Sequence, residues 1–164
     1  MKQILRTLGI GLAWRLSLPV AWLWVWRHQR RIFKHGRVLR ADELEIAAQL
    51  GIERGEEIRI WSVDQVPSPG GFLLRGLGRL AGTTTHGAKG MAIDHGIYLE
   101  SAQAQRRSLL AHELAHVAQF ERLGGSWAFL RDYLSQCLSE GYWSAPLEVE
   151  ARERSAEVGD APPE

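Results

Sequence analysis

Two histidines with a glutamate beside the first form the residue pattern in this sequence that is best suited to chemistry. His112, Glu113 and His116 stand in the stretch His-Glu-Leu-Ala-His. Side chains four positions apart on a helix lie one above the other, so both imidazoles can reach the same metal ion. A shuffled chain of this composition would contain the pattern only about 0.02 times. We therefore interpret it as a metal site rather than a chance arrangement.

Glu113 is the candidate general base of this site. A helix repeat of about 3.6 residues turns its side chain about 100° from that of His112, so it can approach a metal-bound water without binding the metal. Zinc (Zn²⁺) lowers the pKa of its bound water to about 7, and a carboxylate can accept the proton as that water attacks a peptide carbonyl. The pattern predicts a zinc-dependent metallopeptidase that hydrolyses peptide bonds.

A catalytic zinc site needs a third protein ligand, and the residues offer two carboxylates for this position. No histidine follows His116 in the sequence, which excludes a third histidine just after the helix. Glu148 and Glu150 stand downstream, at the start of another predicted helix. They are two positions apart and cannot share a helix face, so we expect at most one of them to bind.

The motif resembles the active-site sequence of the gluzincins, a group of zinc metallopeptidases with the zincin fold. Their third ligand is a glutamate in a Glu-x-x-Ala-Asp or Glu-x-x-Ala-Asn context, and the run Glu-Val-Glu-Ala that starts at Glu148 is similar to it. The resemblance therefore implies that Glu148 is the ligand. More narrowly, residues 90–155 resemble the compact minigluzincins and uncharacterised bacterial zincin-like domains. In these an edge strand precedes the active helix, which implies an edge strand at residues 96–99.

This resemblance also implies where a peptide or protein substrate would bind. In zincins the edge strand binds the substrate backbone by strand addition, so we place a peptide along residues 93–98. His95 and Tyr98 on this strand, and Tyr142 in a later turn, are candidates to stabilise the oxyanion of a tetrahedral intermediate.

One departure from the gluzincin pattern supports an alternative function. Arg152 stands where the family has an acidic or amide residue that supports a ligand histidine. It can instead pair with Glu148 four positions earlier, steering that carboxylate or competing with the metal for it. The alternative is a catalytically inactive, zinc-containing binding or regulatory module at the membrane.

The rest of the pattern predicts a single α+β domain: a short sheet, an active-site helix and C-terminal helices, preceded by an N-terminal hydrophobic helix. Ser101 is expected to cap the active-site helix, and Gly124 with Gly125 to end it. The single cysteine, Cys137, excludes a disulfide framework and is interpreted as a small buried hydrophobe on a helix. Helices are also predicted over 41–50, 126–139 and 146–157, strands over 57–63 and 91–99, a helix or loop over 72–80, and a loop over 83–90.

The charge is unevenly distributed along the chain. Residues 1–40 contain nine Lys or Arg and no acidic residue, whereas residues 41–164 contain eleven basic and nineteen acidic residues. The first segment thus carries +9 and the remainder −8, although the net charge is only +1. We therefore divide the chain into a hydrophobic and basic membrane-associating segment (1–40), a zincin-like domain (41–157) and a disordered tail (158–164).

A membrane surface is the expected partner of residues 8–34. Residues 8–26 are mostly apolar but borderline in length, since a spanning helix needs about 20 apolar residues. Tryptophans at 22, 24 and 26 stand just before a basic cluster, as where a chain enters headgroups. If the segment spans, the catalytic domain is cytoplasmic. The alternatives are a cleaved signal, for which no cleavage site is present, or an arm folded onto its own domain.

The residues argue against nucleic acid as the partner of this basic segment. Nucleic-acid surfaces interleave aromatic residues with cations, whereas here the apolar run precedes the cations. The oligomeric state is not indicated by any of these residues.

Overall fold

The computed structural model describes residues 2–67 and 88–159 of the chain. This part forms five α-helices and a four-stranded sheet, so the predicted α+β class is confirmed. The helices are α1 (Lys2–His35), α2 (Ala41–Gln49), α4 (Arg107–Leu123), α5 (Ser126–Glu140) and α6 (Pro146–Gly159). The strands are β1 (Arg37–Val38), β2 (Arg59–Val63), β3 (Gly90–Ile93) and β4 (Gly96–Glu100). Short 3₁₀ turns span Gly55–Glu57, Ser101–Gln103 and Tyr142–Ser144.

The sheet has the strand order β1-β2-β4-β3, with β2 parallel to β4 and the other pairs antiparallel. The single strand predicted over 91–99 is therefore wrong, because β3 and β4 form a hairpin. Asp94 makes the turn with a φ of 56°, a left-handed conformation that aspartate tolerates better than most residues. Since β4 lies between two strands, the implied edge strand at 96–99 is also wrong. In the described sheet, β3 is the edge strand next to β4.

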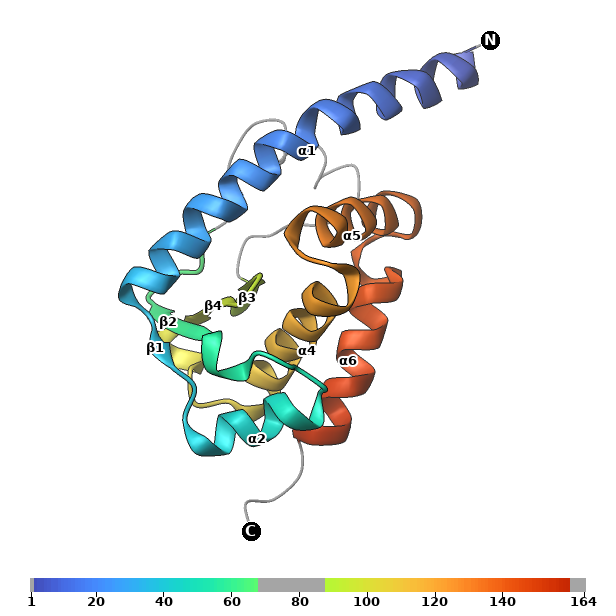
Figure 1. Cartoon of the computed structure of the whole chain (residues 1–164). Coiled ribbons are helices and arrows are strands. Elements are labelled where there is room, and N and C mark those ends of the chain that lie inside the picture. The colour runs from blue at the N-terminus through green and yellow to red at the C-terminus, as the bar shows by residue number, and fades with distance from the viewer. Residues whose placement is uncertain (1, 68–87, 160–164) are drawn as a thin grey trace.

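Helices cover both faces of the sheet, as Figure 1 shows, with α1 on one side and α4 backed by α6 on the other. The alternation of side chains along β4 explains this arrangement. Ile97 and Leu99 are buried in one cluster with Leu114 of α4. Tyr98 points to the opposite face and packs with Val25 of α1. The fold therefore has three layers, and the two sides of the sheet have separate cores.

The second half of α1 belongs to the domain. Leu18, Ala21, Val25 and Ile32 recur at helical spacing and are all buried. Directly after α1, β1 pairs with β2. Part of the segment that we assigned to residues 1–40 thus packs against the rest of the described chain. For residues 18–35 the structure shows the alternative of an arm folded onto its own domain. Within residues 2–67 and 88–159, no helix is long and apolar enough to cross a membrane.

Helix α4 begins later than the sequence suggests. Ser101 opens a 3₁₀ turn, and the residue preceding the helix is Arg106, so the predicted cap is wrong. Gly124 ends the helix with a φ of 85°, as predicted, since glycine adopts this conformation without strain. His112 and His116 consequently lie in the middle of a regular helix, where their relative positions are well defined.

The remaining predictions from the sequence have mixed outcomes. Helix α5 holds Cys137, which is buried and free, as predicted. Burial raises the pKa of its thiol to about 11. Helix α6 continues to Gly159, into the predicted tail, whereas residues 160–164 and the predictions over 72–80 and most of 83–90 lie outside the described residues.

Candidate metal centre

Three side chains from two helices converge on one point. His112 and His116 come from α4 and Glu148 comes from α6, which packs beside α4 in Figure 1. One ligand atom of each lies within 4.8 Å of the other two. The Nε2 atom of His112 is 3.6 Å from Oε2 of Glu148, and Nε2 of His116 is 3.5 Å from Oε1. These residues can hold a metal ion.

The hydrogen bonding of Glu148 tests whether a metal fits there. Its Oε2 atom is buried and has no hydrogen-bond partner among the described residues. A buried carboxylate oxygen without a hydrogen bond is costly, and a cation between it and the imidazoles would remove that cost. Two imidazole nitrogens and one carboxylate oxygen also form a donor set that suits zinc. The side chain of His112 is 20% exposed, against 9% for His116 and 3% for Glu148, so the cluster opens to solvent at His112.

The charges around Glu148 keep it ready to bind a cation. Burial by itself raises the pKa of Glu148, but the imidazoles of His112 and His116 and the hydroxyl of Tyr133 outweigh burial and hold the pKa well below its usual range. For His116, burial lowers the pKa, and the neighbouring carboxylates of Glu148 and Glu113 raise it by more. Because its pKa is held this low, the carboxylate of Glu148 is ionised at neutral pH.

Glu113 lies next to the cluster but is not one of its three members. Only 5% of it is exposed, and burial raises the pKa of its carboxyl. It accepts a hydrogen bond from the backbone of Ala92 in β3. A Cβ atom on Gly90 would lie 2.4 Å from Oε1 of Glu113, so glycine at this position leaves the room that the carboxylate fills. Glu113 is thus held under the start of the edge strand, beside the three candidate ligands.

A second group of side chains orients His116. Gln119, one turn later on α4, places its Oε1 atom 2.9 Å from Nδ1 of His116. Its amide donates to the carbonyl of Leu147 and to Oε2 of Glu150. An acceptor at Nδ1 favours the tautomer that leaves Nε2 free for a metal.

This arrangement also distinguishes the two candidate carboxylates. Glu150 forms an ion pair with Arg122 and accepts a hydrogen bond from Gln119. Glu148 faces the two imidazoles. The geometry therefore favours Glu148 as the third ligand and gives Glu150 an indirect role through Gln119.

Tyr133 is a site residue that the sequence analysis missed. Its hydroxyl donates a 2.7 Å hydrogen bond to Oε1 of Glu148, and burial raises its pKa far above the usual value. It comes from α5, which lies between the two motifs in the sequence. Phe129, one turn earlier, stacks on its ring, and both rings contact His116 edge-on. That helical spacing was the only signal in the sequence, and it also fits ordinary core packing.

Arg152 pairs with Glu148 as its spacing allows, but weakly. The Nη1 atom of Arg152 lies 3.9 Å from Oε2 of Glu148. The guanidinium also donates to the carbonyl of Trp143 and lies over the indole ring, 5.6 Å from its centroid. Trp143 thus holds Arg152 at the edge of ion-pair range. Burial, together with the nearby charge of Glu148, raises the pKa of Tyr142, a predicted oxyanion donor, well above its usual value.

The structure does not bring Tyr98 to the cluster. Tyr98 is only 1% exposed, and its hydroxyl lies 3.1 Å from Nδ1 of His28 in α1. Its ring also packs at 5.5 Å from the ring of Trp61 in β2. Because these contacts lie on the side of the sheet opposite α4, the predicted oxyanion role for Tyr98 is wrong.

His95 is also held away from the metal ligands. It lies in the turn between β3 and β4 and is 3% exposed. Its Nδ1 atom is 2.6 Å from Oδ1 of Asp94, and its Nε2 atom is 2.8 Å from Oε1 of Glu121. Both ring nitrogens are therefore engaged near the carboxyl end of α4. This leaves neither of them free to donate to an oxyanion, so the predicted role does not fit the structure.

Comparison with known proteins gives one match. Residues 80–124 match the family model of the eCIS core domain. No curated protein and no solved structure matches the chain. The matched segment includes β3, β4 and α4 with both histidines and Glu113, and it ends before Glu148. The similarity to the eCIS core domain thus centres on the helix that carries the motif.

Proposed function

We propose that this protein is a zinc-dependent metallopeptidase that hydrolyses peptide bonds. The observation that carries the proposal is the convergence of His112 and His116 with Glu148, whose buried Oε2 atom has no hydrogen-bond partner among the described residues. Both histidines and the candidate base Glu113 lie in one helix, α4, beside the backbone of Gly90. Zinc bound by these three side chains would supply a Lewis acid that polarises the peptide carbonyl and acidifies water.

The other residues of the site would handle the protons. Glu113 would take a proton from the attacking water and deliver it to the leaving amine. Burial raises the pKa of its carboxyl, which strengthens it as a base and brings its pKa closer to neutral pH. Tyr133 and Tyr142 keep their hydroxyl protons, because burial raises the pKa of both. Tyr133 already donates to Oε1 of Glu148 and would hold that carboxylate in place, whereas Tyr142 remains the candidate to stabilise the oxyanion.

The substrate backbone would bind at the edge strand. Since β4 is paired on both sides, strand addition at residues 96–99 is excluded, and β3 is the strand next in line. Gly90, its first residue, lies directly against Glu113. A peptide paired with β3 would therefore run past the proposed base.

The test is hydrolysis of a mixed peptide library by wild-type protein and by Glu113→Gln. We expect the substitution to lower the rate by about 1,000-fold while the zinc content is unchanged, because the amide cannot accept the proton. Glu45→Gln is the matched control, since Glu45 is exposed on α2, and it should keep wild-type activity. Equal rates for wild type and Glu113→Gln would contradict the proposal.

The second candidate is an inactive zinc-containing binding or regulatory module. The pair between Arg152 and Glu148 favours it, since the guanidinium competes with the metal for Oε2. This candidate predicts zinc binding without hydrolysis by the wild type. Replacement of Arg152 by Asn, which restores the gluzincin pattern, separates the two candidates: if activity appears only in this variant, the wild type is the inactive module.

A further inference from the structure

The half of α1 that packs on the sheet has an outer face with large apolar side chains. Its inner face is buried, through residues such as Val25 and Ile32. Helical geometry places other residues of this segment about half a turn round, away from the sheet. These are Val20 (54% exposed), Trp22 (41%), Leu23 (48%), Trp26 (41%) and Phe33 (43%). Two of them are tryptophans, the residue type enriched at membrane–water interfaces.

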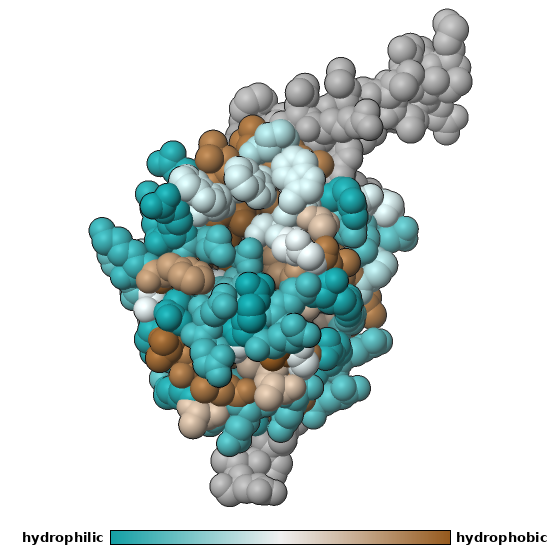
Figure 2. Space-filling model, in the orientation of Figure 1, coloured by the Kyte–Doolittle hydropathy of each residue, from teal (hydrophilic) through white to brown (hydrophobic). Residues whose placement is uncertain are grey.

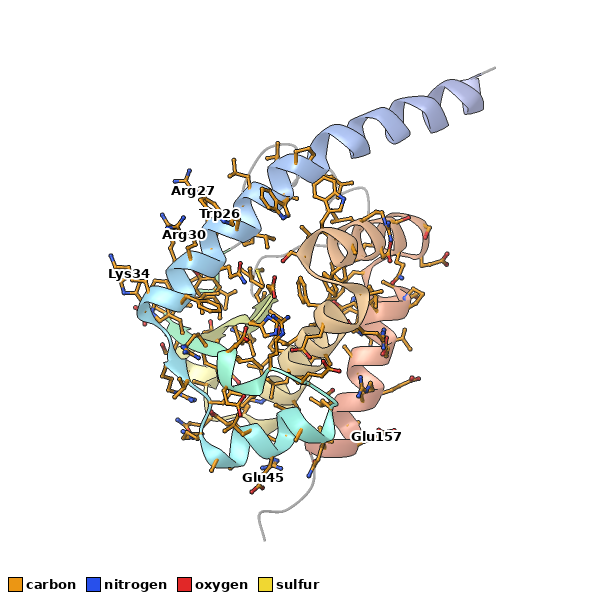
Figure 3. The ribbon with its side chains drawn as sticks, viewed as in Figure 1. Trp26, Arg27, Arg30, Lys34, Glu45 and Glu157 are labelled. Atoms are coloured by element: carbon orange, nitrogen blue, oxygen red, sulfur yellow. The ribbon has the colours of Figure 1, made fainter. Side chains whose placement is uncertain are left out.

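Cations occupy the same outer face. Figure 3 shows Arg27, Arg30 and Lys34 projecting from α1 away from the sheet, on the side where Trp26 also points. The guanidinium of Arg30 lies over the indole of Trp26, 4.8 Å from the ring centroid. Residues 1–40 contain no acidic residue, and no carboxylate in the described part of the chain pairs with these three cations. We call these residues, together with the five exposed apolar ones, the outer face of α1.

The remainder of the molecule has the opposite charge. Residues 41–164 carry an excess of eight acidic residues. Figure 3 places Glu45 of α2 and Glu157 of α6 at the end of the molecule away from α1. In Figure 2, brown and pale residues gather below the grey N-terminal segment, and teal residues dominate the middle of the face shown. A negatively charged surface would therefore attract the α1 side and repel the far end.

We propose that the outer face of α1 docks onto the surface of an anionic lipid bilayer, with the helix lying in the membrane plane. Exposed tryptophan and phenylalanine beside Arg and Lys are the composition of interfacial helices, in which apolar groups enter the acyl boundary and cations bind lipid phosphates. The inner face is buried against the sheet, so residues 18–35 cannot span a bilayer without leaving the core. The proposal does not depend on the metal site.

The experiment is flotation of full-length protein with phosphatidylcholine vesicles that contain about 30% phosphatidylserine, and with pure phosphatidylcholine vesicles. We expect strong binding to the anionic vesicles only, which weakens as salt is added. Combined replacement of Arg27, Arg30 and Lys34 by Gln should lower the partition coefficient by about 100-fold. Trp22→Ser combined with Trp26→Ser should lower it by about tenfold or more.

Matched controls lie on α5. Arg131→Gln removes an exposed cation and Trp127→Ser removes an indole that is 47% exposed, and both should bind as the wild type does. Circular dichroism reports whether each variant is folded. Equal binding to the two kinds of vesicle would overturn the proposal, as would unchanged binding of the α1 variants. Preference for duplex DNA over anionic vesicles at the same ionic strength would also overturn it, in favour of a nucleic-acid surface.

Discussion

Helix α4 takes part in two clusters where histidines meet carboxylates, and the clusters differ in their hydrogen bonding. Near the carboxyl end of the helix, His95 lies between Asp94 and Glu121, with both of its ring nitrogens engaged. In the middle of the helix, His112 and His116 face Glu148, and one oxygen of that carboxylate has no hydrogen-bond partner among the described residues. Both clusters contain histidines and carboxylates, but only the cluster around His95 has its ring nitrogens and facing carboxylates hydrogen-bonded to one another.

The difference shows how a structural cluster can be told from a functional one. Buried polar groups in folded proteins are nearly always hydrogen-bonded, so a cluster that satisfies itself needs no further explanation than stability. Asp94, for example, also accepts a hydrogen bond from Ser126. A buried carboxylate oxygen without a hydrogen-bond partner, next to two imidazole nitrogens, is instead a place where a cation could bind. We therefore expect substitutions in the two clusters to have different effects.

The largest expected effect is on zinc content, which should differ between histidine substitutions in the two clusters. His112→Ala and His116→Ala should each reduce bound zinc from about one per chain to near zero, because each removes one of the three proposed protein ligands. His95→Ala is the matched control and should keep its zinc, since its ring nitrogens face carboxylates elsewhere. The measurement is metal analysis after dialysis. Loss of zinc in His95→Ala but not in His112→Ala would reverse the assignment.

Zinc should stabilise the folded chain only through the cluster of His112, His116 and Glu148. At a free concentration 100 times its dissociation constant, zinc should raise the free energy of unfolding of the wild type by about 2.7 kcal/mol. In Glu148→Ala, which lacks the buried carboxylate oxygen, the same addition of zinc should leave the free energy of unfolding unchanged. Thermal unfolding with and without a chelator measures both. An equal zinc effect in the two proteins would argue against the cluster as the binding site.

The cluster of His95, Asp94 and Glu121 should instead contribute a pH-dependent stability. Burial lowers the pKa of His95, but hydrogen bonds to Asp94 and Glu121 raise it by more. Its contribution is therefore complete below about pH 6.5, the pKa of an unfolded histidine, and is lost as the pH rises through the higher folded pKa. His95→Ala should cost about 2 kcal/mol at pH 6 and less at pH 9. Urea unfolding at the two pH values tests this, and a cost that grows with pH would contradict it.

The smallest expected effect concerns the orientation of a ligand. Gln119→Leu removes the acceptor at Nδ1 of His116, and we expect zinc affinity to fall by about tenfold, with stoichiometry retained at saturating zinc. Competition with a zinc-binding dye measures the affinity. If Gln119→Leu bound zinc as tightly as the wild type, the contact would serve packing alone.

The sequence predicted the three side chains that converge, His112, His116 and Glu148, better than it predicted their surroundings. His112 and His116 are four residues apart on one helix, so their relation is local and can be predicted without the fold. Glu148 came from the gluzincin resemblance, whereas spacing left Glu150 open. Tyr133 could not be predicted, because its contact with Glu148 depends on how α5 folds back between the motifs.

The errors in the sheet have a similar origin. Asp94 turns the chain where a continuous strand was expected. The turn was not predicted, because a single residue in the left-handed conformation leaves little trace in the hydrophobic pattern. Tyr98 was assigned to the site from its nearness to the motif, yet it alternates with Ile97 and Leu99, which face α4. That alternation was visible in the sequence, but which side would meet the helix depended on α1.

The measurement that most directly tests the account is the zinc content of Glu148→Ala beside Glu150→Ala. The two substitutions remove the same group two residues apart, but Glu148 faces the imidazoles and Glu150 is paired with Arg122. The account predicts almost no zinc in Glu148→Ala and about one zinc per chain in Glu150→Ala. Zinc retained in Glu148→Ala and lost in Glu150→Ala would contradict it.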